Sequence, residues 1–287
     1  MLQVARLAPA LLGESRHLVA GFLRQSLNAD GGFLDRDGQS DLYYTVFGLE
    51  ALLALREPAP GITASYLHQF GDGASLDFVH LACLARALGS ASPAGLNPDT
   101  CARILRRLES FRSADGGFAV TQRAPAGSAY ACFLAMVAFQ DLGAAVPDRD
   151  GMLGCLEGVR AADGGYANGP GAEAGSTPAT AAAVMVMRQL DVAPDAAVSR
   201  WLLERCHSSG GFFAAPRTPL PDLLSTATAL HALAALHADI DPLRERCLDF
   251  VDTLWTSTGG FYGSWADDTL DCEYTYYGLL ALGHLTV

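Results

Sequence analysis

Two kinds of hydrophobic pattern alternate along the chain. Segment 99–112 carries its apolar residues on one face of a helix. These residues are Cys101, Ile104, Leu105, Leu108 and Phe111. Segment 41–55 is instead apolar on nearly every side, and a helix of this kind must be enclosed by other parts of the protein. The pattern therefore predicts one-face helices that alternate with fully enclosed helices.

A turn of paired glycines follows each one-face helix. Paired glycines can adopt positive φ and end a helix sharply, and the aromatic residue after them can tuck beneath the turn. The turns are Asp30-Gly31-Gly32-Phe33, Asp115-Gly116-Gly117-Phe118, Asp163-Gly164-Gly165-Tyr166, Ser209-Gly210-Gly211-Phe212 and Thr258-Gly259-Gly260-Phe261. The last four recur every 46 to 49 residues. The first interval is about two repeats long and contains a degenerate form of the turn, Gly71-Asp72-Gly73. The chain therefore has six repeats, with turns near 31, 72, 116, 164, 210 and 259.

Six helix pairs predict an all-α fold, an (α/α)6 toroid in which residues 1–287 form a single domain. The one-face helices would form an outer ring, and the enclosed helices an inner ring around a central cavity. An open solenoid is the alternative. Closure is favoured because the first and last repeats are alike and neither carries a polar cap.

Composition excludes several functions. The net charge of -12 argues against binding nucleic acid, which needs a basic face. All 19 basic residues are arginines, so Schiff-base chemistry and a P-loop are excluded. Half of the residues are hydrophobic, yet no apolar stretch reaches the roughly 18 to 20 residues that a transmembrane helix needs.

The seven cysteines are scattered and never spaced as Cys-x-x-Cys, which indicates reduced thiols in a cytoplasmic protein. The first residues contain only a short apolar run, Leu7 to Leu12, so we expect no signal peptide.

The glycine-aromatic turns at this period, each followed by an apolar helix, resemble the prenyltransferase and squalene-cyclase repeat over residues 14–287. That superfamily includes the β subunits of protein farnesyl- and geranylgeranyltransferases and the class II terpene cyclases. The resemblance implies that an isoprenoid or terpenoid small molecule binds in the ring. For a transferase it also implies a possible helical partner like an α subunit.

The zinc site of the prenyltransferases is reduced in this chain. Their D-x-x-H-T segment matches Asp271 to Thr275, but Tyr274 replaces the zinc-binding His. Their D-x-C-Y segment matches Asp222 to Ser225, but Leu224 replaces the zinc-binding Cys. Since a catalytic zinc needs about three protein ligands, we predict no zinc and no other cofactor. Arg217 is the residue best matched to the family's diphosphate-binding Arg and Lys.

The class II cyclases carry D-x-D-D-T at the same structural position, and their middle Asp is a protonated acid. This chain has Asp271-Cys272-Glu273-Tyr274-Thr275 at that position. The resemblance implies that Glu273 takes the place of the acid, with Asp271 beside it. Two close carboxyls in an apolar site would raise the pKa of one of them. The similar segment 265–269 lies too early for the helix register, so we interpret it as a loop. Cys272 is the one cysteine expected near the cavity mouth, where it and Asp222 form a minor alternative metal site.

The candidate residues cluster at the starts of the enclosed helices, where we expect Glu273, Asp222 and Asp41 to converge. The candidate catalytic residues are Asp271, Glu273, Tyr274 and Asp222, and the candidate substrate-binding residues are Arg217, Asp41, Tyr44, Phe47, Tyr130 and Tyr277. Helix capping is the alternative role of the three aspartates, and core packing that of the aromatics. His80 and His231 are interpreted as hydrogen-bonded core residues.

Three functions remain open. The first is a prenyltransferase-β-like toroid that binds an isoprenoid and transfers or modifies it without the family's zinc. The second is a small class II terpene cyclase in which Asp271 or Glu273 is the acid. The third is a non-catalytic toroid that binds a lipid or a partner protein.

Overall fold

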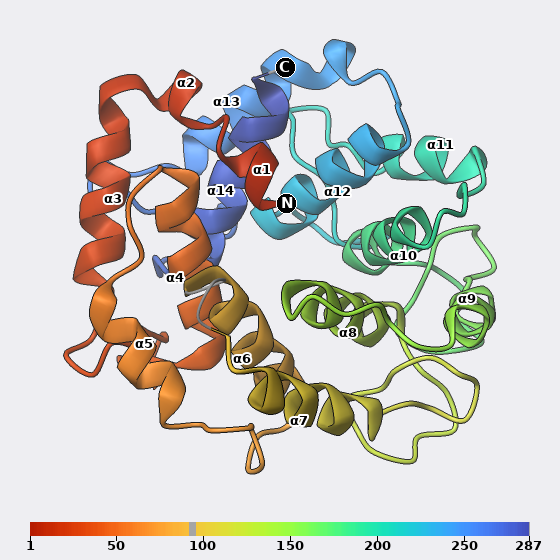
Figure 1. Ribbon diagram of the computed structural model, residues 1–287. Helices are drawn as coiled ribbons and strands as arrows, with labels where there is room; N and C mark the ends of the chain where they lie inside the picture. Colours follow the sequence, from red (N-terminus) through yellow and green to blue (C-terminus); the bar gives the residue numbers. More distant parts are fainter. Residues whose placement is uncertain (92–95, 287) are drawn as a thin grey trace.

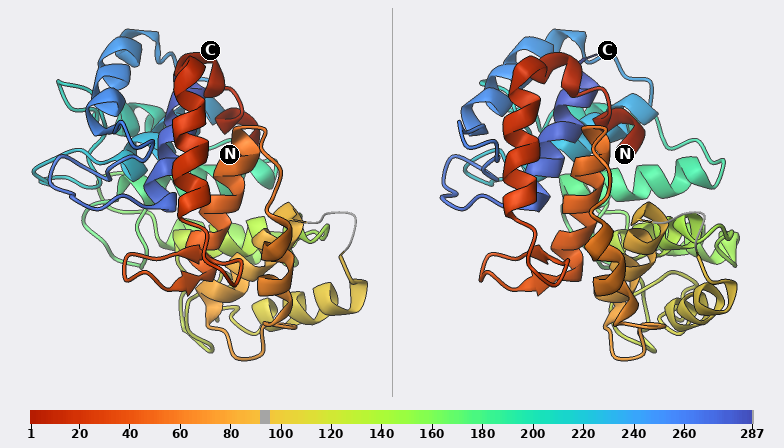
Figure 2. Two further views of the ribbon diagram at one scale, coloured as in Figure 1. Left: turned by 90° about the vertical axis from the view of Figure 1, so that its left-hand side faces the viewer. Right: turned by 60° about the vertical axis from the view of Figure 1, so that its left-hand side comes forward.

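The computed structural model describes residues 1–91 and 96–286, which form a ring of paired helices (Figure 1). Within these residues, six helices make up the inner ring: α4 (Leu42–Ala54), α6 (Phe78–Ala91), α8 (Ala129–Asp141), α10 (Thr177–Gln189), α12 (Leu223–Ala235) and α14 (Cys272–Leu285). Six others surround them: α3 (Arg16–Gln25), α5 (Gly61–His68), α7 (Pro98–Glu109), α9 (Arg149–Gly158), α11 (Ala197–Leu203) and α13 (Arg244–Leu254). The two further views show the outer helices lying around the inner ones (Figure 2). The predicted α/α toroid is confirmed.

The inner ring is closed. Each inner helix packs against the next, and α14 packs against α4. The outer ring closes as well, because the glycine turn of the last repeat contacts α3: a Cβ on Gly259 would lie 2.2 Å from the carbonyl oxygen of Leu18. The open solenoid is therefore excluded.

The inner helices run parallel to one another, so their N-termini share one rim. At that rim Asp41 before α4 contacts His80 of α6, and the Leu223 amide donates to the carbonyl of Gly263. At the opposite rim Arg86 of α6 donates to Glu50 of α4. We call these the N-terminal rim and the C-terminal rim.

The aromatic residue after each paired-glycine turn is buried and ties the turn to the next inner helix. The amide of Phe212 donates to Thr226 Oγ1 at 2.9 Å, and that of Tyr166 donates to Thr180 Oγ1 at 2.9 Å. Phe33, Phe118 and Phe261 make the corresponding bonds to Thr45, Cys132 and Thr275. The expectation that these aromatics lie beneath the turns is confirmed, and the bonds set where each inner helix starts.

The remaining elements are short. The first residues form α1 (Leu2–Ala5), α2 (Pro9–Leu12) and the 3-10 helix η1 (Gly13–Ser15), and η3 (Asp241–Leu243) precedes α13. Helix α1 packs against α4 and α14. Strands β1 (Phe33–Leu34) and β2 (Ser40–Asp41) pair antiparallel, with Phe33 opposite Asp41. Across the described residues, no helix is long and apolar enough to cross a membrane.

Candidate active site

A central cavity of about 340 Å³ lies inside the inner ring. Side chains from α4, α8, α10, α12 and α14 line it, together with Met1 and Asn168. Pro178, Ala181, Ala182 and Met185 of α10 form one apolar side, with Leu224 of α12. The volume is within the range of small-molecule sites.

Aromatic rings form much of the remaining wall. Tyr43, Tyr130, Phe133 and Tyr277 line the cavity. Phe47 lies behind them, with its ring centroid 4.9 Å from that of Tyr43 and 5.4 Å from that of Tyr277. Of the predicted substrate-binding aromatics, Tyr130 and Tyr277 therefore line the cavity, and Phe47 supports the wall.

Glu273 is the acidic side chain among the residues that line the central cavity. Its Oε1 accepts a hydrogen bond from the Tyr43 hydroxyl at 2.6 Å, and within residues 1–91 and 96–286 its Oε2 accepts none. Burial raises the pKa of Glu273 to about 7, although the Tyr43 hydroxyl acts in the opposite direction. A raised pKa of Glu273 is the shift that we expected from the sequence. It leaves a large fraction of the Glu273 carboxyls protonated near neutral pH.

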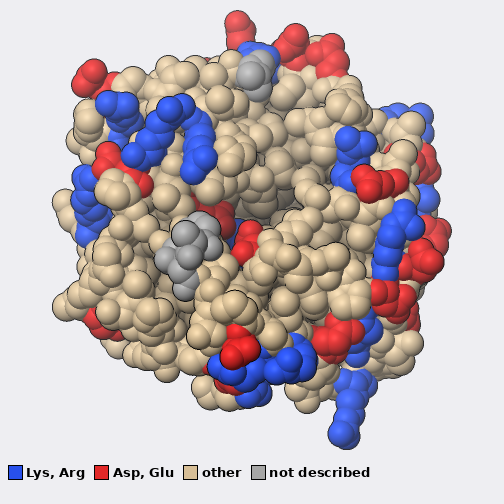
Figure 3. Space-filling view, viewed as in Figure 1, with Lys and Arg blue, Asp and Glu red and all other residues tan. Residues whose placement is uncertain are grey.

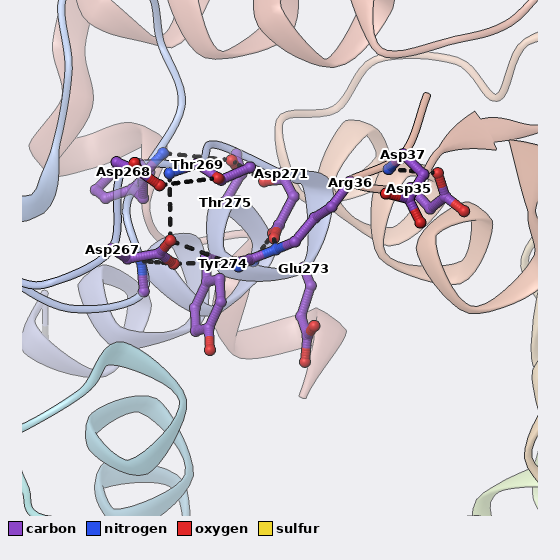
Figure 4. A network of polar contacts seen from close by, with 12 residues as sticks. Asp35, Arg36, Asp37, Asp267, Asp268, Thr269, Asp271, Glu273, Tyr274 and Thr275 are labelled. Atoms are coloured by element: carbon purple, nitrogen blue, oxygen red, sulfur yellow. Dashed lines mark hydrogen bonds and ion pairs between the residues drawn. The ribbon is translucent and has the colours of Figure 1, made fainter. Parts of the chain in front are cut away.

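Asp271 has a different neighbourhood, which centres on Arg36 from the loop between β1 and β2. Arg36 Nε donates to Asp271 at 2.8 Å, and Arg36 Nη2 donates to Asp267 at 2.9 Å. Asp271 also accepts from the Tyr274 amide and so caps α14. Figure 4 shows Arg36 reaching across to these carboxylates while the Glu273 carboxyl points away from them. Asp271 is therefore an ion-paired helix cap, and Glu273 is the carboxyl that faces the cavity.

Arg36 and Asp267 are the site residues that sequence reasoning missed. Segment 265–269 is a loop, as interpreted, yet it supplies Asp267 to the cluster. The two residues are 231 positions apart, so no local pattern connects them. Tyr274 lies under Arg36, whose guanidinium carbon is 5.4 Å from the ring centroid. Tyr44 lies near the same cluster. Burial, and to a smaller extent the charges of Asp271 and Glu273, raise the pKa of Tyr44 to about 12.

The other predicted polar residues do not line the central cavity. Asp222 caps α12 and accepts from the Ser225 amide and hydroxyl at 2.7 and 2.8 Å. Asp41 caps α4 and accepts from His80 Nε2 at 3.1 Å. Arg217 is exposed in the loop before α12. The expected convergence of Asp41 and Asp222 on Glu273 is not found, because each carboxylate is held by its own helix start or by a neighbouring histidine.

His80 is not the core residue that we expected. Its ring is partly exposed and contacts both Asp41 and Asp77. The bond to Asp41 raises the pKa of His80 to about 9, so it carries a charge at neutral pH.

The residues at the family's zinc position do not fit a zinc ion. Asp222 is engaged by Ser225, and no cluster of three or more His, Cys, Asp or Glu side chains suited to a metal occurs in the described part of the chain. Cys272 is fully buried rather than at the cavity mouth, and burial raises the pKa of its thiol to about 12. The alternative pairing of Cys272 with Asp222 is therefore not supported.

A second cavity of about 310 Å³ adjoins the first on the side of the C-terminal rim. Glu50, Arg86 and Asp141 line it, and Met1, Phe133, Met185 and His231 line both cavities. On the face seen in Figure 3 the molecule is hollowed near its centre, with acidic and basic atoms beside uncharged ones. The interior thus has an aromatic part that holds Glu273 and a polar part that holds the ion pair of Arg86 and Glu50.

The sequence matches the model of a known family. The model described as the prenyltransferase alpha-alpha toroid domain matches residues 12–94, 70–213 and 196–286. No curated protein sequence matches the chain.

Several solved structures share the fold. The type II terpene cyclase MstE from Scytonema, in complex with its product merosterolic acid A, has a TM-score of 0.67 and 13% sequence identity, and 97% of each chain is covered. The same cyclase has been solved with its substrate geranylgeranyl dihydroxybenzoate. The Candida albicans protein geranylgeranyltransferase-I complexed with GGPP has a TM-score of 0.53 and 14% identity, over 99% of this chain and 81% of that chain.

An unsaturated glucuronyl hydrolase from Streptococcus agalactiae is also similar, with a TM-score of 0.64, 13% identity, and 96% of this chain and 92% of that chain covered. Its chemistry is unrelated to isoprenoids, so these likenesses establish the fold and leave the reaction to the residues of the site.

Proposed function

Because the chain belongs to the prenyltransferase alpha-alpha toroid family, we propose that its central cavity binds an isoprenoid chain and that Glu273 protonates a double bond of that chain. The proposal makes the protein a small cyclase or isomerase that acts on an alkene. It rests above all on the Glu273 carboxyl, which lines an aromatic cavity and accepts a hydrogen bond from the uncharged Tyr43 hydroxyl.

Glu273 has the properties that a general acid needs. Burial raises its pKa to about 7, so that it holds a proton near neutral pH. The Tyr43 hydroxyl donates to Oε1, which leaves Oε2 to carry the proton of a side chain that lines the cavity. The rings of Tyr130, Phe133 and Tyr277 surround the space where positive charge would develop, and ring faces stabilise cations.

The reaction requires no co-reactant. The proton of Glu273 forms a new C–H bond at one alkene carbon, and the other carbon becomes a cation. A second double bond of the same chain attacks that cation and closes a ring. A neighbouring carbon then loses a proton to solvent water, which restores a double bond, and the Glu273 carboxylate regains a proton from solvent. The product is therefore an isomer of the substrate.

Prenyl transfer from a diphosphate without zinc is the second candidate. It is less well supported because the cations that would hold a diphosphate are engaged or distant. Arg36 is neutralised by Asp267 and Asp271, and Arg217 is exposed in a loop. A diphosphate would also lie close to Glu273. A cytoplasmic location, a helical partner protein and the lack of bound zinc stay predictions.

Deuterium labelling separates the two candidates. The purified protein is incubated in D₂O with a prenylated arene such as geranylgeranyl dihydroxybenzoate, or with a prenyl alcohol, and the products are analysed by mass spectrometry. Acid-initiated cyclisation adds one non-exchangeable deuteron to each product molecule, because the Glu273 proton exchanges with solvent. Diphosphate-dependent transfer adds none.

A matched incubation with prenyl diphosphates and a phenolic acceptor tests the second candidate directly. Products that form only from diphosphates and carry no deuterium would overturn the acid assignment. An absence of product from every substrate, with the ligands shown to bind, would leave the non-catalytic toroid.

A further inference from the structure

A pair of histidines lies at the far end of the central cavity from Glu273. His231 of α12 and His284 of α14 are joined by a hydrogen bond of 2.9 Å between His231 Nδ1 and His284 Nε2. Burial lowers the pKa of His284 to about 4 and that of His231 well below its usual value. Both rings are therefore neutral, and in each the two nitrogens are one donor and one acceptor.

The second nitrogen of His231 has no partner. Its Nε2 is buried and forms no hydrogen bond to any residue that the structure describes. His231 lines the central cavity, so its ring borders the space that a bound molecule would occupy. A buried polar atom without a partner costs free energy, which a suitable ligand would recover.

We propose that His231 Nε2 binds a hydroxyl group at one end of the isoprenoid whose alkene lies at Glu273. This inference rests on the proposed function and names its substrate class, a prenyl alcohol or a prenylated phenol. A hydroxyl both donates and accepts, so it satisfies Nε2 whichever ring of the histidine pair carries the shared proton. A diphosphate only accepts, and it would bring several negative charges into an aromatic cavity.

The separation of Glu273 from His284, the hydrogen-bond partner of His231, indicates the length of the chain. Glu273 and His284 both lie on α14 and are eleven residues apart, so they are separated by ~16 Å along the helix axis at 1.5 Å per residue. An isoprene unit adds four chain bonds, one more than a peptide residue, and so spans roughly 4.5 Å when extended. An extended chain of three to four units would reach from one group to the other.

Binding measurements test the proposal without turnover. The background is the Glu273→Gln protein, and the probes are farnesol and its hydrocarbon counterpart farnesene, titrated by calorimetry. We expect farnesol to bind about threefold to tenfold more tightly than farnesene, which is the contribution of one buried hydrogen bond. Adding His231→Phe should remove this preference, and adding His231→Gln should keep part of it.

Thr228→Val provides the matched control. Thr228 lines the same cavity on the same helix, but its hydroxyl already donates to the Leu224 carbonyl at 2.7 Å. The farnesol preference should survive this change. If His231→Phe does not fold, ¹⁵N NMR of the His231 ring in the Glu273→Gln protein tests the same contact. The Nε2 signal should shift when farnesol is added and should not shift with farnesene.

Each result has a defined meaning. The assignment of His231 is overturned if the preference for farnesol persists in His231→Phe, or if the Nε2 signal does not shift when farnesol is added. Either result leaves the role of Glu273 intact. Equal affinity for both probes in the background protein has the same meaning. A failure of both probes to bind overturns the isoprenoid cavity and the proposed function with it.

Discussion

Glu50, which is buried, and Glu273, which is partly buried, lie in the ring interior at opposite rims and differ in the charge of their partners. Glu50 of α4 accepts from the guanidinium of Arg86 at 2.7 Å. Glu273 of α14 accepts from the neutral hydroxyl of Tyr43 at 2.6 Å. A charged donor keeps a carboxylate ionised as half of an ion pair, whereas a neutral donor leaves a buried carboxyl able to hold its proton. The partner, more than burial, decides that one glutamate is structural and the other is suited to chemistry.

Arg86 shows the same principle from the side of the cation. Burial alone would lower its pKa, but the charge of Glu50, together with smaller contributions from Tyr276, Cys83 and Asp141, raises it. Arg86 therefore keeps its charge inside the protein, and Glu50 accepts the hydrogen bond of its buried guanidinium.

The largest expected effect is on activity. Glu273→Gln should lower the rate of product formation by about 10²- to 10⁴-fold, the usual contribution of a general acid, because glutamine cannot supply a proton. Glu50→Gln should lower activity only in proportion to the protein that unfolds. Steady-state rates per folded molecule, with folding followed by circular dichroism, make the comparison. Equal losses in the two variants would contradict the distinction.

The second largest effect is on the free energy of unfolding, and it concerns Glu50. Arg86→Leu leaves Glu50 buried without its cation and should lower the free energy of unfolding by about 3–5 kcal/mol. The control is Arg24→Ala, which breaks the exposed pair of Arg24 and Glu57 and should cost less than about 1 kcal/mol. Urea unfolding of both variants measures the difference, and similar costs would show that the buried pair is not special.

The pH dependence of stability tests the Glu273 carboxyl itself. Its pKa is about 7 in the folded protein against 4.5 when exposed, so the folded state binds the proton more tightly. Stability from this group is fully present below pH 4.5 and is lost as the pH rises to about 7, by about 3 kcal/mol at 1.36 kcal/mol per pKa unit.

Glu273→Gln removes this titration. The variant should match the unmodified protein near pH 5 and be the more stable of the two at pH 8, as measured by urea unfolding at each pH. A constant difference across that range would mean that Glu273 titrates normally.

The smallest effect concerns the neutral donor. The Tyr43 hydroxyl stabilises the ionised form of Glu273, so Tyr43→Phe should raise the pKa of Glu273 further. The alkaline limb of the pH–rate profile should move upward by about one unit. Tyr44→Phe is the control, since the hydroxyl bonded to Glu273 belongs to Tyr43. A downward shift in Tyr43→Phe would mean that the hydroxyl stabilises the protonated form.

The fold could be predicted because its signals are local and repeated. The paired glycines mark each turn, and the aromatic after them is buried in every repeat that has one, as Phe33 and Phe212 show. The helix boundaries also followed the sequence closely: segment 41–55 became α4, Leu42–Ala54, with Asp41 as its cap. The prediction of a closed ring rested on the similarity of the first and last repeats and on the lack of a polar cap on either.

The site could be predicted only in part. Glu273 was identified from its place at the start of the last inner helix, and the structure places it on the cavity wall. Arg36 was not identified, because its contacts with Asp267 and Asp271 join loops from opposite ends of the chain. The same holds for His231, whose role depends on a partner, His284, from another repeat. Patterns within one repeat do not reveal contacts between repeats.

The candidate acid lies on the seam where the ring closes. Arg36 and Tyr43 come from the first repeat, and Asp271 and Glu273 come from the last. During synthesis the first repeat emerges from the ribosome long before the last. Until the last repeat is made, the surface of the first repeat that packs against it stays exposed. The segment that completes the ring also delivers the acid, its tyrosine partner and its ion-paired neighbour to one another. A nascent chain therefore has no assembled acid site, and activity would report that translation and ring closure are both complete.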